Sequence, residues 1–161
     1  MAEIKIKTIL VPTDFSEYVD LVMDYAVFLA KSFGARIKLL HVVQSVHLAE
    51  AINWMDAMVP PAGEINISEQ LRKNAQKKLG EFRERYRAEG VEVEILISEG
   101  VPFVEIIQCL ERESVDMVVM GSHGRTGITH LLMGSVAEKV VRKAPCPVLC
   151  IKPEGFKFEM P

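Results

Sequence analysis

Five short apolar runs alternate along this chain with stretches in which apolar residues recur every three or four positions. Short continuous runs are typical of buried strands, and the longer periodic stretches are typical of amphipathic helices. Strands are predicted at 4–11, 36–43, 91–98, 115–120 and 148–151. Strands that alternate with helices form a parallel sheet covered on both faces, because right-handed crossovers carry the helices over it. The pattern therefore predicts an open five-stranded α/β fold of the Rossmann-like kind.

The four helices expected between the strands are placed by their apolar stripes and end signals. The first is predicted to have Asp14 or Ser16 as its cap, Gly34 as its stop, and a core face of Leu21, Val22, Tyr25, Phe28, Leu29 and Phe33. The second covers 67–89, with Ser68 as its cap and a core face of Ile67, Leu71, Ala75, Leu79, Phe82 and Tyr86. The third follows Pro102 and buries Val104, Ile107 and Leu110, and the last covers 135–143.

The chain has 161 residues, so we expect a single domain over 1–161. Its least regular stretch is 44–66, where a short helix is predicted at 47–58 before a Pro-Pro-Ala-Gly break. We interpret 44–66 as a variable insertion, which is either a plain surface excursion or a lid or partner contact. Residues 153–161 are expected to form a short C-terminal tail.

Composition and charge argue against several classes of protein. The net charge is −3, without the basic excess of nucleic-acid-binding proteins, so we expect no nucleic-acid partner. No apolar run approaches the ~18–20 residues that a membrane span requires, and the N-terminus shows no signal-peptide pattern. We therefore expect a cytoplasmic protein with no membrane partner. Cys109, Cys146 and Cys150 are interpreted as reduced core residues, and His41 as a hydrogen-bonded core residue.

A glycine-rich stretch follows the fourth predicted strand. Gly121, Gly124 and Gly127 recur at three-residue spacing, and Gly134–Ser135 opens the last helix. Backbone N–H groups in such a loop, and at a helix N-terminus, bind phosphate. Ser135 has Glu138 three residues on, which is also capping-box spacing, so its hydroxyl caps the helix, contacts an anion, or does both. The loop lacks the lysine of a Walker A motif, and it is not the dinucleotide fingerprint, which follows the first strand.

The polar residues after the first strand, Pro12–Thr13–Asp14, face this loop if the strand order is 3-2-1-4-5. Ligands of open α/β sheets bind where the strand order reverses, which here falls between the first and fourth strands. Asp14 could hold a ribose hydroxyl or a divalent cation, or it could cap the following helix. We find no side-chain cluster that would bind a metal by itself.

At these residues the chain resembles the universal stress protein family, in its ATP-binding class. The resemblance rests on Gly121-x2-Gly124-x9-Gly134-Ser135, together with the segments ILVPTDFS, LLHVV, VVMGSHG and APCPVLCIK, and it covers essentially the whole chain. It implies strand order 3-2-1-4-5, ATP (or bound AMP or ADP) between the first and fourth strands, and an accompanying Mg²⁺ or Mn²⁺. It also implies a homodimer formed through the last strand, at 147–152.

The same resemblance implies which residues contact the nucleotide. Asp14 would lie near the ribose, and Val42 would meet adenine through its backbone. The full set is Pro12, Thr13, Asp14, Val42, Met120, Gly121, Ser122, His123, Gly124, Arg125, Thr126, Gly127, Gly134, Ser135 and Val136.

Three functions follow from these patterns. The first is an ATP-binding stress-response regulator whose nucleotide state is read by an unidentified protein partner or by its own dimer. The alternative is a weak ATPase or autophosphorylating enzyme, with His123 as base and Arg125 as a charge on the phosphates; neither has a partner visible in the sequence, so no catalytic residue is assigned. A phosphorylated receiver domain is disfavoured, because the third strand ends in Ser98–Glu99 and lacks the expected aspartate.

Overall fold

The computed structural model describes residues 4–44, 67–123 and 133–153. In chain order, their strands and helices are β1 (Thr8–Thr13), α1 (Val19–Phe33), β2 (Arg36–Val43), α3 (Ile67–Arg87), β3 (Val93–Glu99), α4 (Pro102–Arg112), β4 (Met117–Gly121), α5 (Ser135–Lys143) and β5 (Val148–Ile151). The predicted helix at 47–58 lies outside the described residues.

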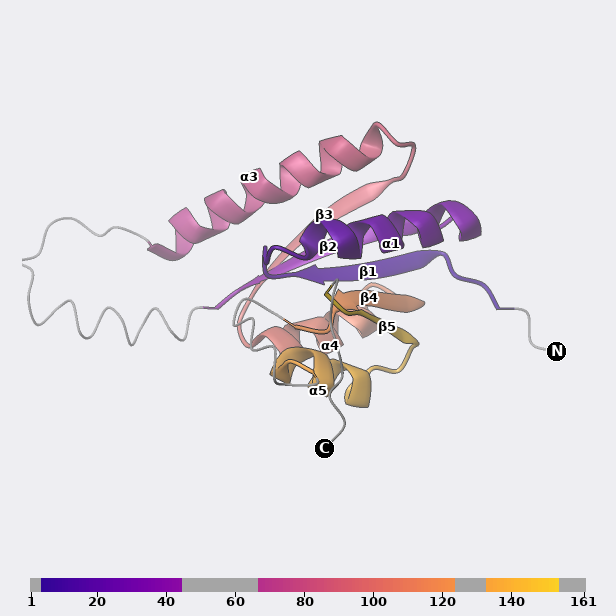
Figure 1. Ribbon diagram of the computed structural model, residues 1–161. Coiled ribbons are helices and arrows are strands. Elements are labelled where there is room, and N and C mark those ends of the chain that lie inside the picture. Colours follow the sequence, from indigo (N-terminus) through magenta and orange to yellow (C-terminus); the bar gives the residue numbers. More distant parts are fainter. Residues whose placement is uncertain (1–3, 45–66, 124–132, 154–161) are drawn as a thin grey trace, which may run out of the picture.

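The strands form one sheet in the order β3-β2-β1-β4-β5, and every neighbouring pair is parallel. Helices α1 and α3 cover one face of the sheet, and α4 and α5 cover the other (Figure 1). The predicted fold class and strand order are therefore confirmed. The sequence order reverses between β1 and β4, at the centre of the sheet.

Two hydrophobic cores lie on the two faces of the sheet. In β1, Ile9 and Val11 pack into the core beneath α1 and α3, whereas Leu10 packs into the core beneath α4 and α5. Side chains of a strand alternate between faces, so a strand buried on both sides must be apolar at consecutive positions. Each of these fully buried side chains contributes about 1.5–3 kcal/mol relative to exposure.

Strand β1 begins later than predicted. Ile4 is 83% exposed, and the first strand residue is Thr8 rather than Ile4. The N–H groups of Lys7 and Thr8 both donate to the Asp116 carboxylate, at 2.8 and 2.9 Å, which anchors the chain where the sheet begins. Among the described residues, no strand pairs with the alternating residues before this anchor, so their pattern does not produce a strand.

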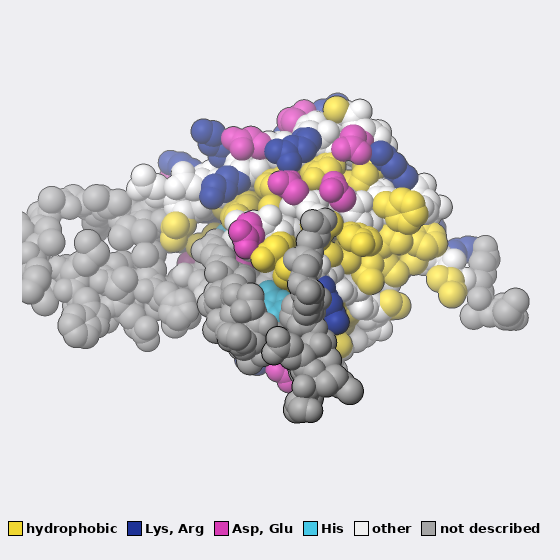
Figure 2. Space-filling model, viewed as in Figure 1, with side chains coloured by type: hydrophobic (Ala, Val, Ile, Leu, Met, Phe, Trp, Pro, Cys, Tyr) yellow, Lys and Arg dark blue, Asp and Glu magenta, His cyan; other side chains and the backbone are white. Residues whose placement is uncertain are grey.

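The predicted core face of α1 is partly wrong. Tyr25, Phe28 and Phe33 are exposed, Phe28 by 66%. The buried residues are Val22, Met23, Ala26, Val27 and Ala30. The buried face therefore carries aliphatic side chains and Met23, and the aromatic residues lie on the outside of the helix. Hydrophobic side chains gather accordingly over the carboxyl half of α1 (Figure 2).

The other helices differ less from the prediction. In α3, Ala75, Leu79 and Tyr86 are buried as expected, but Leu71 is exposed. In α4 the buried residues are Ile106, Cys109 and Leu110, while Val104 and Ile107 are half-buried. All three cysteines are unpaired, as predicted, and burial raises the pKa of each thiol.

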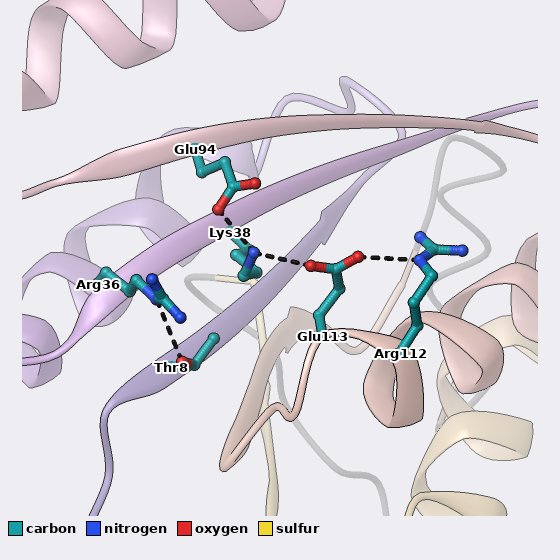
Figure 3. Close-up of polar contacts among 6 residues, drawn as sticks. All are labelled: Thr8, Arg36, Lys38, Glu94, Arg112 and Glu113. Carbon is teal, nitrogen blue, oxygen red and sulfur yellow. Dashed lines mark hydrogen bonds and ion pairs between the residues drawn. The ribbon is translucent and has the colours of Figure 1, made fainter.

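A buried lysine links the sheet to the end of α4. The Lys38 ammonium, on β2, lies 2.6 Å from the Glu94 carboxylate of β3 and 2.8 Å from the carboxylate of Glu113, which follows α4 (Figure 3). Glu113 also accepts from Arg112 at 2.9 Å. Burial lowers the pKa of Lys38, but the hydrogen bonds to Glu113 and Glu94 outweigh it, so the net pKa is raised and the lysine stays charged. Sequence reasoning placed Lys38 in a strand but did not predict this cluster.

Candidate functional site

Strands β1 and β4 separate at their carboxyl ends. β1 pairs with β2 as far as Thr13–His41, but its register with β4 ends at Leu10–Val118. The Thr8 carbonyl accepts from the N–H of Asp116, just before β4. Backbone groups alternate sides along a strand, so the ring nitrogen of Pro12 also points toward β4 and has no hydrogen to donate there. Pro12 therefore lies within β1, not after it as predicted, and helps to end the pairing with β4 where the strand order reverses.

The turn after β1 is held by its own side chains. The Thr13 hydroxyl accepts from the Phe15 N–H at 3.1 Å, and the Asp14 carboxylate accepts from the Ser16 N–H at 3.0 Å. Phe15 has φ of 60°, the left-handed conformation, which costs a non-glycine residue roughly 1–2 kcal/mol. Helix α1 has Tyr18 at its N-cap and no side-chain cap, so the predicted capping by Asp14 or Ser16 is wrong. Strain of this kind is concentrated at ligand-binding sites, where the surrounding structure maintains it.

Aromatic packing fixes this turn against β2. The His41 and Phe15 ring centroids lie 4.4 Å apart, and the His41 Nδ1 lies 2.8 Å from the Thr13 carbonyl oxygen. A carbonyl can only accept, so this contact places a hydrogen on Nδ1. His41 is thus the hydrogen-bonded core residue that was predicted. The Lys78 ammonium of α3 lies 5.1 Å from the Phe15 ring centroid. Nothing in the sequence pattern indicated that Phe15 and Lys78 shape this region.

The end of β4 is tied to the start of α5 through Ser122. The Ser122 N–H donates to the Ile151 carbonyl at 2.8 Å, and the Gly134 N–H donates to the Ser122 carbonyl at 2.7 Å. The Ser122 hydroxyl and the His123 Nδ1 lie 2.9 Å apart. A Cβ on Gly121 would lie 3.2 Å from the His123 carbonyl oxygen, so glycine suits this close approach. These contacts bring the N-terminus of α5 to the carboxyl end of β4.

The predicted capping box at the start of α5 is wrong. Gly134 occupies the N-cap in an extended conformation without a side-chain cap, and Ser135 is the first helical residue. Glu138 pairs with Arg142 at 2.7 Å instead of reaching back to the cap. Within the described residues the Ser135 hydroxyl makes no hydrogen bond. It stands exposed at the positive end of the helix dipole, where anions are stabilised.

The structure brings two groups of predicted site residues to one edge of the sheet: Pro12, Thr13 and Asp14 at the carboxyl end of β1, and Gly121, Ser122 and His123 at the carboxyl end of β4. Val42 lies half-buried near the end of β2. The Met120 side chain is buried in the core beneath α4 and α5, and the half-buried Val136 side chain packs against that core. Gly124, Arg125, Thr126 and Gly127 lie outside the described residues.

Two negative findings concern the described residues alone. Over 4–44, 67–123 and 133–153, no three metal-ligating side chains gather in one place. No helix in the same ranges has the length and hydrophobicity to cross a membrane.

Comparison with known proteins now identifies the group to which this sheet and its loops belong. The sequence profile of the universal stress protein family matches residues 5–152. The chain belongs to the universal stress protein family. It is 35% identical to universal stress protein MJ0531 of Methanocaldococcus jannaschii over 149 residues, which cover 91% of this chain and 82% of that protein.

Solved structures of the family agree in fold. The structure of protein MJ0577, described as a structure-based assignment of biochemical function, superposes with a TM-score of 0.78 at 30% identity, covering 92% of this chain and 97% of that one. A family member from Arabidopsis thaliana, solved with AMP bound, superposes with a TM-score of 0.62 at 21% identity, covering 92% and 93%. At that lower identity the likeness shows the fold alone. This protein is thus a stress-response family member with the family's parallel sheet.

Proposed function

We propose that this universal stress protein binds ATP between the carboxyl ends of β1 and β4 and acts as a nucleotide-dependent regulator. The proposal rests on one observation, which is that β1 and β4 stop pairing before their carboxyl ends, at the point where the strand order reverses. The residues that follow the two strands lie at the same edge of the sheet, and the backbones of the strand ends do not pair with each other there. A member of the same family from Arabidopsis thaliana was solved with AMP bound, and the proposal extends that class of ligand to this chain.

The described residues offer suitable contacts for the ribose and for the phosphates of a nucleotide. In the proposed site Asp14 lies toward the ribose, and its carboxylate, which accepts the Ser16 N–H, is the kind of acceptor that a ribose hydroxyl or a cation requires. The Ser135 hydroxyl and the N-terminus of α5 offer donors to the terminal phosphates. Gly124, Arg125, Thr126 and Gly127 complete the phosphate loop in this proposal, on the strength of their sequence motif. A Mg²⁺ or Mn²⁺ held mainly by the phosphates would neutralise part of their charge.

Binding is favoured over efficient catalysis. The Ser122–His123 contact gives the His123 ring an orienting partner, which is the one observation that favours the alternative of slow ATP hydrolysis or autophosphorylation. Incubation with γ-labelled ATP measures how much catalysis accompanies binding. We expect turnover well below about 1 per second, and turnover above that rate would contradict the preference for binding over efficient catalysis.

The proposal includes a homodimer through β5, at 147–152. β5 ends the sheet, and Leu149 on it is an exposed large hydrophobic residue. An edge strand with unpaired backbone groups and an exposed apolar residue is suited to pairing with a second copy. In this arrangement the Ser122 N–H bond to Ile151 would connect the nucleotide site directly to the dimer edge.

The test of nucleotide binding is a titration of the purified protein with Mg-ATP, alongside mass spectrometry of any nucleotide released on denaturation. The proposal predicts one bound adenine nucleotide per chain. Gly124→Val should abolish binding while the far-UV circular dichroism stays unchanged, because a β-branched side chain would occupy the phosphate loop. Gly80→Ala, on α3, is the matched glycine control and should bind normally. Equal binding by both variants would mean that the glycine-rich loop is not the phosphate site.

A further inference from the structure

The edge of the sheet formed by β3, opposite the edge formed by β5, carries a groove that is not part of the proposed nucleotide site. It lies between α3 and β3 and has a volume of about 590 Å³. The lining residues of α3 are Arg72, Gln76, Gly80 and Arg83, and those beside or on β3 are Glu92, Val93, Glu94, Ile95 and Ile97. β3 ends the sheet, so one side of its backbone has no neighbouring strand among the described residues.

The free backbone groups of β3 belong to the residues that line the groove. The Glu92 carbonyl accepts from the Ile37 N–H of β2 at 2.9 Å, so Glu92 points its backbone toward β2. Backbone direction alternates along a strand. Val93, Ile95 and Ile97 therefore present their N–H and C=O groups outward, and Ile95 and Ile97 are only half-buried. An added strand would find both hydrogen-bonding groups and apolar contacts here.

On the helix side, the groove is lined by one face of α3, which has an arginine at each end. Arg72 and Arg83 are 11 residues apart, close to three whole turns, so both face the same way and lie about 16 Å apart along the axis. Gly80 lies between them, and a Cβ built on it would meet no atom within 4 Å, so the groove is open at its middle. A glycine within a long helix lowers the stability of the helix. Here the absence of a side chain at Gly80 leaves space in the groove.

The groove favours an acidic occupant. Helix α3 carries seven Lys or Arg and three Glu, a net +4, although the whole chain has a net charge of −3. Basic side chains run along the upper edge of the molecule where α3 lies, with acidic ones among them (Figure 2). Arg72 has no ion pair within the described part of the chain. Arg83 pairs only with its exposed neighbour Glu84 at 3.1 Å, and such surface pairs are weak.

The carboxylates of Glu92 and Glu94, on the strand side of the groove, offset only part of the positive charge of these arginines. Glu94 is already held by Lys38 at 2.6 Å, so its charge is compensated. Glu92, at the amino end of β3, has no ion pair among the residues that the structure describes. The two arginines therefore leave the groove with a positive balance.

From these observations we infer that the groove between α3 and β3 docks an extended acidic peptide of a partner protein as an additional strand on β3. Main-chain hydrogen bonds to Val93, Ile95 and Ile97 would provide affinity, and Arg72 and Arg83 would select acidic residues four to six positions apart in the peptide, given about 3.3 Å per extended residue. This surface is separate from the nucleotide site and from the proposed dimer edge on β5.

The probe is a fluorescein-labelled peptide, Asp-Thr-Val-Thr-Ile-Thr-Asp, whose acidic and apolar side chains share one face. Binding is measured by fluorescence anisotropy, and backbone protection by amide hydrogen exchange. We expect saturable binding by the wild type, at least tenfold weaker binding by Arg72→Glu, and at least fivefold weaker binding of a peptide with Asn in place of Asp. Amide exchange at Val93, Ile95 and Ile97 should slow when the peptide binds.

Gly80→Leu tests the groove without removing a charge. Its side chain has space and a helix-compatible backbone, so the variant should fold and bind Mg-ATP as the wild type does, yet lose at least tenfold in peptide affinity. Lys77 lies on the same helix away from the groove, so Lys77→Leu and Lys77→Glu are the matched controls and should bind the peptide normally.

Several outcomes would overturn the inference. These are no peptide binding by the wild type up to about 1 mM, equal affinity for the Asn peptide, or binding that leaves amide exchange in β3 unchanged. A wild-type dimer that Gly80→Leu converts to a monomer would instead identify a second copy as the occupant.

Discussion

Removing the buried charge of Lys38 should destabilise the protein by a predictable amount. Loss of one partner from a fully buried ion pair costs about 3–5 kcal/mol, whereas an exposed pair contributes about 0–1 kcal/mol. The Lys38 side chain is 6% exposed, but those of Glu113 and Glu94 are 20% and 46% exposed, so water can reach them. Arg112 would still bond Glu113. We therefore expect Lys38→Met to lower the free energy of unfolding by about 2 kcal/mol, or Tm by about 4–8 °C.

Urea denaturation followed by far-UV circular dichroism measures this loss. Lys31→Met is the matched control, because Lys31 forms a single exposed pair with Glu89 at 3.0 Å, and it should change stability by less than about 0.5 kcal/mol. Adding Glu113→Gln to Lys38→Met should recover part of the loss, because it removes the carboxylate left without its buried partner. If Lys38→Met were no more destabilising than Lys31→Met, the reasoning about burial would be refuted.

The same cluster predicts how stability depends on pH. Hydrogen bonds from Lys38 and from Arg112 hold the pKa of Glu113 below its ordinary value of 4.5. A carboxyl group whose pKa is lower in the folded protein stabilises it above the unfolded pKa, and that contribution is lost as pH falls through the folded pKa. The free energy of unfolding should therefore decline below about pH 4.5, and less steeply in Lys38→Met. The pKa of Lys38 is shifted in the other direction, upward from 10.5. The contribution of Lys38 to the free energy of unfolding is therefore present up to about pH 10.5 and is lost as the pH rises through the folded pKa.

Three further predictions concern single positions. Gly80→Ala should raise the free energy of unfolding by about 1 kcal/mol, because it adds helix propensity where a Cβ has space; a loss would show that the glycine is needed for packing. Ser135→Ala should weaken ATP binding about three- to tenfold and AMP binding less, since one hydrogen bond to the terminal phosphates is removed; equal losses would place the serine elsewhere. Leu149→Lys should yield a monomer by analytical ultracentrifugation, and an unchanged dimer would place the interface away from β5.

The fold was largely predictable because it depends on coarse patterns. Alternating apolar runs and helical stripes were enough to predict the parallel sheet, since burial on both faces leaves few other arrangements for segments such as Ile9–Val11. The details of helix faces were less predictable. Hydrophobicity alone ranks Phe28 above Ala26 as a core residue, but the face of α1 that contacts the sheet buries Ala26 and leaves Phe28 exposed. Spacing alone could not reveal this, because apolar residues occupy more than one face of α1.

The candidate site was predictable where it follows topology and not where it depends on local contacts. The placement of Asp14 at the same edge of the sheet as the end of β4 follows from the strand order. The left-handed conformation of Phe15, its packing on His41 and the unused hydroxyl of Ser135 depend on tertiary contacts that no motif records. The predictions that Asp14 and Ser135 cap helices were wrong because aspartate and serine occur in turns, at helix caps and at anion sites alike.

Isothermal titration of the nucleotide-free protein with Mg-ATP is the most direct test of the proposed nucleotide site. We predict saturable binding of one ATP per chain, lost in Gly124→Val and retained in Gly80→Ala. Absence of any binding by the correctly folded wild-type protein, with no adenine nucleotide recovered from the native preparation, would contradict it.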